Sequence, residues 1–339
     1  MKALYIKSYG GPEVMQVGEL PEPQPRRREV VVAVKASSIN PCDWKVRAGE
    51  MKFMTGKTFP KTLGSDFAGV VERVGAGVTG VSAGDRVYGV TPVMLRKPGA
   101  QAERLAVATN RLRRMPDGMS FDIAAALPIA GLTALNGLRQ CGELQGKTVL
   151  INGATGGVGH FAVQIAKARG ATVTAVCSDR NAERARSLGA DAVIDYRKQD
   201  FTLGSIRYDV VFDAHGHLKF GAVARALKDH GILVSTLPNP ALIARSVWQK
   251  MFGSREIKLC NLRDHPEDYA ELERLLAEGL VKPVIDNIAP LAEAWGFRRL
   301  DRGEVPAAIR QTHQFGGACC ASAVAMWQNL RNRVKIGCS

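Results

Sequence analysis

The chain has no long hydrophobic run. None of its apolar stretches approaches the roughly 18 residues that a membrane-spanning helix requires. The N-terminal stretch, MKALYIKSYGGPEVM, also lacks the apolar core of a secretory signal peptide. The hydrophobic content of 46% and the charged content of 23% are those of a soluble globular protein. We therefore expect a cytoplasmic protein without a membrane span.

Cysteine is present but follows no pattern. The seven cysteines are scattered, an odd number cannot all pair within one chain, and no two have the C-x-x-C spacing of a zinc site. Scattered cysteines of this kind are typical of reduced thiols in a reducing compartment.

Acidic residues are outnumbered: 32 Asp and Glu stand against 46 Lys and Arg, which gives a formal net charge of +14. A basic balance can indicate nucleic-acid binding. The basic residues are spread along the chain, however, and no basic helix is interleaved with aromatic residues. We therefore expect a solvated basic surface rather than a nucleic-acid site, and one that favours anionic ligands such as a phosphorylated dinucleotide.

A chain of 339 residues exceeds one ordinary core, so two domains are expected. Residues up to about 125 are rich in short strands and turns, which predicts a barrel-like domain. Residues 121–138 predict a helix or a helix pair, with an interruption marked by Pro128 and Gly131. From Thr148 onward strands and helices alternate, as in a parallel sheet covered on both faces. Strands are expected at 29–36, 67–74, 85–90, 148–151, 172–177, 192–194, 210–212 and 231–236, and helices at 158–169, 182–188 and 220–227.

Residues 148–170 have the pattern of a dinucleotide-binding unit. A short apolar run meets a glycine-rich turn, Gly153-Ala-Thr-Gly-Gly-Val-Gly159, and an apolar stripe of helical period follows. Such glycines let the backbone approach a pyrophosphate, while the helix N-terminus offers free N–H donors and a partial positive charge. The alternative is a purely structural turn. The predicted cofactor-binding residues here are Ala154, Thr155, Gly156, Gly157, Val158 and Gly159.

Four short motifs resemble the medium-chain dehydrogenase/reductase superfamily over roughly residues 1 to 300. They are GSDFAGVVERVG at 64–75, GDRV at 84–87, LPIAGLTA at 127–134 and ADAVIDY at 190–196. The resemblance implies an α/β fold with two domains. A GroES-like β-barrel catalytic domain spans 1–125, with segment 262–339 returning to it, and a Rossmann NADP-binding domain with a doubly wound parallel sheet spans 126–261.

Zinc alcohol dehydrogenases of this superfamily differ at two ligand positions. They have Gly-His-Glu where this chain has Gly64-Ser65-Asp66, and a cysteine where it has Asn40. A catalytic zinc needs three protein ligands, and an amide and a hydroxyl bind it poorly. The four-cysteine structural zinc lobe is also missing, since residues 90–110 contain no cysteine. We expect no metal site.

The zinc-free quinone oxidoreductase branch, with zeta-crystallin-like proteins and enone reductases, is the closest match. Residues 38–49 contain Asn40-Pro-Cys-Asp-Trp-Lys45, which resembles the N-P-x-D-W-K subgroup. The resemblance implies a zinc-independent oxidoreductase that passes hydride from NADPH to a hydrophobic quinone or to the C=C bond of an α,β-unsaturated carbonyl. It also permits a homodimer. Two alternatives stay open: an enoyl reductase acting on carrier-bound thioesters, and a non-catalytic NADPH-binding sensor or RNA-binding protein.

The loop after the second Rossmann strand bears on the choice of cofactor. An NAD-selecting acid would fall on Val176, which cannot accept a hydrogen bond. Asp179 is the counter-indication, unless it caps the helix that begins near Asn181. A guanidinium pairs well with phosphate, so we expect NADPH. The resemblance assigns Ser178 and Arg180 to its adenosine 2′-phosphate, and Tyr196 to the same phosphate or to the adenine. Asn181, in the same loop, is also predicted to bind the cofactor.

Without a metal, the protein must hold nicotinamide C4 within about 3.5 Å of the acceptor carbon and stabilise negative charge on the carbonyl oxygen. Lys45 is the candidate for that oxygen, unless it is a solvated lysine in a loop. Asn40 orients substrate or the nicotinamide ribose, or is a turn amide. Asp43 is either an ion-pair partner of Lys45 or a structural acid of the turn. Thr133 contacts the nicotinamide in the family, and its alternative is a bond to its own helix.

Other polar and apolar residues are harder to assign. His160 is expected at the surface near phosphate, and His215 and His217 near the cofactor cleft, with no acid matched to them. Arg96, Arg245, Trp248, Met251 and Phe252 border the substrate cleft in relatives, although core packing would explain the apolar ones equally well. The chain after Ile309 departs from the family pattern, so its usual cofactor contact is not carried over.

Overall fold

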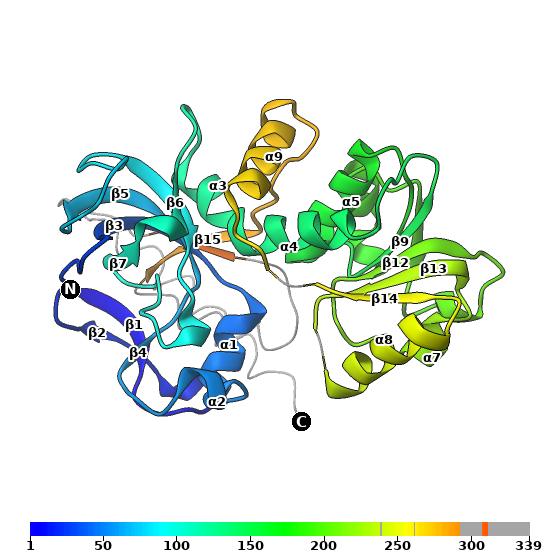
Figure 1. Cartoon of the computed structure of the whole chain (residues 1–339), viewed down its shortest axis with the longest axis horizontal. Helices are drawn as coiled ribbons and strands as arrows, with labels where there is room; N and C mark the ends of the chain where they lie inside the picture. The colour runs from blue at the N-terminus through cyan, green and yellow to red at the C-terminus, as the bar shows by residue number, and fades with distance from the viewer. Residues whose placement is uncertain (238, 261, 292–306, 311–339) are drawn as a thin grey trace, which may run out of the picture.

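The computed structural model describes residues 1–237, 239–260, 262–291 and 307–310. Figure 1 shows two parts side by side: strands β1 to β8 lie in one, and strands β9 to β14 lie in the other. Among the described residues, no helix is both long and apolar enough to cross a membrane. The predicted limits of the two domains stay a prediction.

Strand β3 (Glu29–Ser38) is the centre of the first part. It pairs antiparallel with β5 (Asp66–Val74), β7 (Arg104–Ala108) and β16 (Ala307–Arg310). Its run of β-branched residues is buried because neighbours cover it, and Val30, Val32 and Val34 pack in one core cluster. The other strands of this part are β1 (Lys2–Ile6), β2 (Met15–Glu19), β4 (Lys61–Thr62), β6 (Arg86–Val90), β8 (Leu112–Arg114) and β15 (Asn287–Pro290).

Short helices connect these strands. They are α1 (Pro41–Ala48), α2 (Lys52–Thr55) and α3 (Phe121–Ala126), with 3-10 turns at Pro12–Val14, Val93–Leu95 and Thr109–Arg111. β15 pairs parallel with β16, and β16 pairs with β3, so a segment from late in the sequence completes the sheet of the first part.

The second part is a six-stranded parallel sheet with the order β11-β10-β9-β12-β13-β14. The order reverses between β9 and β12, and the carboxyl edge at such a reversal is where open α/β sheets bind ligands. The strands are β9 (Thr148–Asn152), β10 (Thr172–Cys177), β11 (Ala192–Asp195), β12 (Tyr208–Asp213), β13 (Leu227–Ser235) and β14 (Glu256–Leu259). The helices are α5 (Gly157–Ala168), α6 (Ala182–Ser187), α7 (Phe220–Val223) and α8 (Pro240–Phe252), with 3-10 turns at Asp179–Asn181 and Phe201–Leu203.

The predicted parallel sheet is confirmed, but the helix predicted over 220–227 was too long. α7 ends at Val223, because the chain must turn to begin β13 at Leu227. The backbone N–H of Tyr208 donates to the carbonyl of Ala226 at 2.8 Å, which fixes the start of that strand beside β12. Sheet pairing therefore overrides the helical pattern of the last residues.

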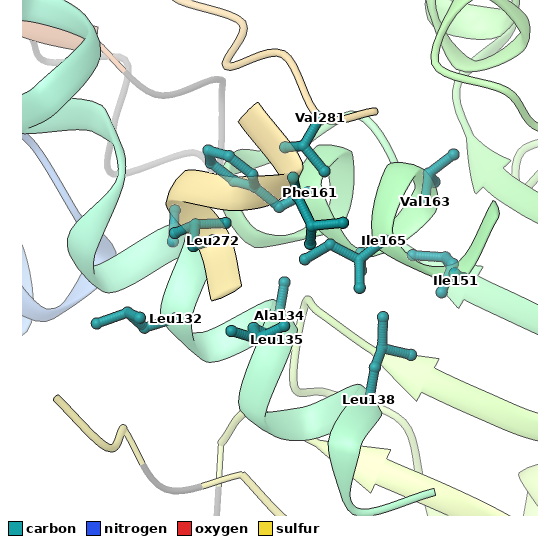
Figure 2. Packing of buried hydrophobic residues seen from close by; sticks show 14 of the residues in the cluster. Leu132, Ala134, Leu135, Leu138, Ile151, Phe161, Val163, Ile165, Leu272 and Val281 are labelled. Atoms are coloured by element: carbon teal, nitrogen blue, oxygen red, sulfur yellow. The ribbon is translucent and has the colours of Figure 1, made fainter. Parts of the chain in front are cut away.

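Helix α4 (Pro128–Arg139) follows α3 after Leu127, which confirms a helix pair with its break at Pro128. The predicted break at Gly131 is wrong, because Gly131 lies inside α4. Figure 2 shows α4 packed against α5, β9 and α9 (Pro266–Ala277). A Cβ on Gly131 would lie 2.6 Å from Leu272 Cδ2 of α9, and one on Gly137 would lie 2.6 Å from the Phe212 ring. These glycines therefore allow α4 to pack closely against its neighbours.

Helix α9 lies between the two parts in Figure 1 and bonds to both. In the first part, the hydroxyl of Tyr88 donates to Glu273 Oε1 at 2.5 Å. Toward the second part, Glu271 accepts a hydrogen bond from Arg139 of α4 at 2.5 Å and another from Arg169, which follows α5, at 2.6 Å. Burial opposes ionisation of Glu271, but the hydrogen bonds from the two arginines outweigh it and lower the pKa. These contacts set the position of the two parts relative to each other.

Candidate functional site

The glycine turn between β9 and α5 is shaped for close approach. Gly153 has φ of +76°, and its N–H and that of Ala154 both donate to the Val176 carbonyl at 3.1 Å. A Cβ on Gly159 would lie only 2.0 Å from the Gly153 carbonyl oxygen, so only hydrogen fits there. Because α5 begins at Gly157, the first N–H groups of that helix have no partner within it. The turn therefore has free N–H donors and room for close approach, while pyrophosphate binding by residues 154–159 stays a prediction.

Polar groups at the ends of β9 and β12 hold the next loop in place. Asn152 Nδ2 donates to Asp213 Oδ1 at 2.8 Å, and Asp213 also accepts from the N–H groups of Gly216 and Leu218, each at 2.9 Å. This loop carries His215 and His217, whose ring centroids are 4.7 Å apart.

His215 lies beside the glycine turn. Its Cβ is 3.5 Å from the position that a Cβ on Gly153 would take, so His215 lies next to the glycine turn, and its proximity to the cofactor stays a prediction. The side chain is exposed, and partial desolvation together with the neighbouring His217 lowers its pKa. The His215 imidazole is therefore neutral at this edge of the sheet near pH 7.

The prediction that His160 is a surface residue was wrong. Its ring is buried, its Nδ1 is 3.0 Å from the Gly156 carbonyl, and its Nε2 accepts from the Val284 N–H at 3.2 Å. Burial lowers its pKa to about 4, so the ring is neutral at pH 7. The Nε2 acceptor requires the proton on Nδ1. His160 thus ties the glycine turn to a segment that is distant in sequence.

The residues predicted for the 2′-phosphate lie together at the carboxyl edge of β10 and β11. Ser178 is buried at the end of β10, Arg180 is exposed, and Asn181 closes the 3-10 turn that follows. Tyr196, exposed just after β11, donates its N–H to the Cys177 carbonyl at 3.3 Å. The structure therefore brings both loops to one place.

Asp179 does not cap the helix that follows it. Asn181 is the residue at the N-cap of α6, and no side-chain cap bond is formed there. Asp179 instead pairs with Lys198 at 2.8 Å, an interaction that the sequence analysis missed. The hydrogen bond and the charge of Lys198 lower the pKa of Asp179, so the carboxyl is ionised at neutral pH.

Thr133 lies in α4 and is partly exposed. Its backbone carbonyl accepts from Cys260 Sγ at 3.1 Å. Within the described residues, its hydroxyl forms no bond to its own helix, so that alternative is wrong. Its contact with the nicotinamide stays a prediction.

Asn40 is buried at the N-cap of α1, and its amide is already used. Nδ2 donates to Asp66 Oδ2 at 2.8 Å and to Ser38 Oγ at 3.0 Å, which occupies both N–H bonds. Its backbone N–H donates to Asp43 Oδ2 at 2.8 Å. Both amide N–H bonds of Asn40 are therefore used within the protein, and the predicted contact with substrate has no amide N–H available for it.

Asp43 is the structural acid of this turn, and the alternative ion pair with Lys45 is absent from the described residues. It accepts from Asn40 at the start of α1 and from Ser65 Oγ at 3.2 Å. Burial raises its pKa to about 6 against these hydrogen bonds. Lys45 lies within α1 rather than in a loop, partly exposed, with its Nζ 5.6 Å from the centroid of the Trp44 ring.

Asp66 joins this network to the crossover helix. It is fully buried and accepts from Ser38 Oγ at 2.5 Å, from Asn40 at 2.8 Å and from the Ile129 N–H of α4 at 3.0 Å. Burial raises its pKa to about 7. Since Ile129 is in the first turn of α4, the helix dipole favours the ionised carboxylate. The loop that carries α1 is thereby fixed to the helix that leads into the second part.

Family comparisons agree with this geometry. Residues 26–117 match the model of the alcohol dehydrogenase GroES-like domain, and residues 188–304 match that of a zinc-binding dehydrogenase. The chain is 35% identical to the chloroplast envelope quinone oxidoreductase homolog of Arabidopsis thaliana, over 87% of this chain and 92% of that protein. It is 39% identical to the chloroplastic NADPH-dependent alkenal/one oxidoreductase of the same plant, over 86% of this chain and 73% of that protein.

A solved structure extends the likeness to three dimensions. The quinone oxidoreductase from Coxiella burnetii aligns with a TM-score of 0.86 at 32% identity, over 92% of this chain and 99% of that one. The chain belongs to the medium-chain dehydrogenase/reductase superfamily, in its quinone oxidoreductase branch. This membership confirms the family and the fold that the motifs predicted: a GroES-like domain and a Rossmann domain with a parallel sheet.

One family model carries zinc in its description, yet the zinc-ligand positions of the superfamily are filled differently here. Asn40 and Ser65 form hydrogen bonds to Asp66 and Asp43, and Cys42 Sγ is 3.5 Å from Ser65 Oγ. Among the described residues, no group of three His, Cys, Asp or Glu side chains is arranged to hold a metal ion.

The three apolar residues of α8 that were predicted to border the substrate cleft face solvent rather than the core, whereas Leu242 of the same helix is buried. The exposed fractions are 46% for Trp248, 66% for Met251 and 69% for Phe252, so core packing does not explain them. The Arg245 guanidinium lies 4.5 Å from the centroid of the Trp248 ring. Arg96 is also exposed and donates from Nε to the Met54 carbonyl at 3.3 Å. Their contact with a substrate stays a prediction.

Proposed function

We propose that this protein is an NADPH-dependent oxidoreductase that transfers hydride, without zinc, to a quinone or to the C=C bond of an α,β-unsaturated carbonyl. One observation carries the proposal: Asn40 and Ser65, at the zinc-ligand positions of the superfamily, are held in hydrogen bonds to Asp66 and Asp43, while the glycine turn keeps the shape of a pyrophosphate site. The names of the two plant relatives support both acceptor classes.

The cofactor-binding residues divide by the part of NADPH that they hold. The N–H groups at the start of α5 bind the pyrophosphate, and Gly159 permits its approach. The 2′-phosphate binds among Ser178, Arg180, Asn181 and Tyr196, which share one edge of the sheet. Thr133 contacts the nicotinamide from α4. When bound, NADPH supplies the hydride.

Lys45 is the proposed catalytic residue. Its ammonium donates a hydrogen bond to the acceptor oxygen, stabilises the charge that develops there and provides a proton. Asn40 is then a positioning residue: it does not reach the substrate with its amide N–H groups, but fixes the start of α1 through Asp66 and Asp43. The acceptor is small and hydrophobic, and the exposed aromatic residues Trp248 and Phe252 of α8 suit such a ligand.

The assembly and location are further parts of the proposal. β14 is an edge strand of the parallel sheet, so a homodimer through β14 is proposed, and light scattering of the purified protein tests it. A cytoplasmic location stays our prediction, although the two plant relatives bear chloroplast names. We propose no nucleic-acid partner.

The test follows NADPH absorbance with purified protein in the presence of a chelator, offering a 1,4-quinone and a 2-alkenone side by side, with NADH as the cofactor control. Turnover that survives chelation with NADPH supports the proposal. Tight NADPH binding without turnover of either acceptor would refute it. Activity only on a carrier-bound enoyl thioester would then favour the enoyl reductase, and salt-sensitive RNA affinity would favour the sensor.

A further inference from the structure

Asp179 presents a chemical conflict within the proposed NADPH site. It stands between Ser178 and Arg180, the two residues proposed to hold the 2′-phosphate, and its side chain is 68% exposed. An acid in this loop accepts a hydrogen bond from the free 2′-hydroxyl of NADH and repels a 2′-phosphate. Uncompensated, Asp179 would select the wrong cofactor.

The parallel pairing of β10 with β11 brings a compensating charge to the same place. Cys177 is the register partner of Asp195, so the loops after the two strands leave the sheet side by side. Lys198, in the second loop, reaches across and places its Nζ 2.8 Å from Asp179 Oδ2. The same Nζ is 4.0 Å from Asp195 Oδ2. Both partners of the Lys198–Asp179 pair are largely exposed.

An exposed pair of this kind contributes little to stability. Its effect on a charged ligand is larger, since a carboxylate close to the 2′-phosphate repels a group that carries nearly two negative charges. With Lys198 in place, the net charge of the pair is zero and Arg180 remains as an attractive cation in the same loop. The pair is therefore better explained by ligand recognition than by folding.

We propose that Lys198 determines specificity for NADPH by neutralising Asp179 at the 2′-phosphate site. The inference rests on the proposed cofactor, NADPH, and adds Lys198 to the residues of its binding site. Lys198 is a positioning and charge-compensating residue that acts through Asp179, and Asp179 is the element that would otherwise favour NADH.

Equilibrium binding of four ligands to the full chain tests the inference: NADPH, NADH, 2′,5′-ADP and 5′-AMP. In Lys198→Gln, affinities for NADPH and 2′,5′-ADP should fall between about fivefold and twentyfold, because the carboxylate of Asp179 then stands uncompensated close to the 2′-phosphate. Affinities for NADH and 5′-AMP should change less than about twofold. The loss should shrink at high salt, which screens exposed charges.

Lys167→Gln is the matched control. Lys167 forms a comparable pair with Asp191 at 2.9 Å, but Asp191 precedes β11 and so lies at the opposite edge of the sheet. This variant should bind all four ligands like the parent.

A double variant tests whether Lys198 acts on the 2′-phosphate through Asp179. If Lys198 acts through Asp179, Asp179→Asn should restore NADPH affinity in the Lys198→Gln background to within about twofold of the parent. A double variant as weak as Lys198→Gln alone would overturn the inference, and so would an equal loss for NADH and NADPH. A parent that shows no preference for the 2′-phosphorylated ligands would instead overturn the choice of NADPH, so the two failures are distinguishable.

Discussion

Replacing Gly159 by alanine should disable the cofactor site through one added methyl group. Its Cβ would meet the Gly153 carbonyl oxygen at 2.0 Å, the Gly153 carbonyl carbon at 2.8 Å and Ala154 Cα at 2.9 Å. All three are backbone atoms, so no side chain can turn aside to relieve the contact. Because real Cβ atoms essentially never come closer than 3.0 Å, the turn or the helix start must move by about 1 Å.

The expected magnitude follows from that displacement. Overpacking of this kind costs about 1–3 kcal/mol of folding stability. A misplacement of about 1 Å in a binding loop can cost about 100-fold in function, so NADPH affinity should fall by roughly that factor. Fluorescence titration with NADPH and a thermal unfolding curve measure the two effects separately.

A graded series of alanine variants strengthens this test. At Gly156 the added Cβ would be 3.3 Å from the Gly153 oxygen, and a small loss of affinity is expected. At Gly221 in α7 nothing lies within 4 Å, so the variant should bind NADPH like the parent and be slightly more stable. If Gly159→Ala binds NADPH within about twofold of the parent, the account of the turn as a tight phosphate cradle is refuted.

Two further variants test the catalytic and structural assignments. Lys45→Met should lower kcat/KM by about 100-fold with unchanged NADPH affinity, while Lys45→Arg should retain part of the activity; equal activity of Lys45→Met and the parent would remove Lys45 from the mechanism. Burial lowers the pKa of His160 from 6.5 to about 4, so the stability that its neutral form contributes is present above pH 6.5 and is lost as pH falls toward 4. The melting temperature of His160→Gln should therefore fall less steeply than that of the parent across this range, and parallel slopes would contradict the assignment.

The second part of the fold could be predicted closely because its signals are local. The strand at 148–152, the glycines after it and the apolar stripe of α5 all lie within about 20 residues, a spacing over which hydrophobic period is informative. The antiparallel strand β3 was equally clear from its valines. In contrast, no helix was predicted over α1, since its eight residues begin with Pro41 and include few apolar side chains.

Contacts between distant residues could not be foreseen in the same way. His160 is buried and accepts a hydrogen bond from Val284, which lies 124 positions later in the chain. No local sequence pattern predicts that contact. Asn40 was predicted to orient substrate or the nicotinamide ribose, and its hydrogen bond to Asp66 was not foreseen because that bond depends on how β3 and β5 pair. The Lys198–Asp179 pair could have been predicted from the sequence, because loops that follow neighbouring parallel strands meet at one edge of the sheet. The atypical sequence after Arg310 lies outside the described residues.

The central claim is hydride transfer from NADPH by the protein without a metal. The most direct measurement compares oxidation of NADPH with that of NADPH deuterated at the transferred C4 position, after removal of metals with a chelator, using a 2-alkenone and a 1,4-quinone. The account predicts turnover with at least one acceptor, slowed by deuterium and unchanged when zinc is restored. Turnover that vanishes on chelation and returns with zinc, or no oxidation with either acceptor, would contradict it.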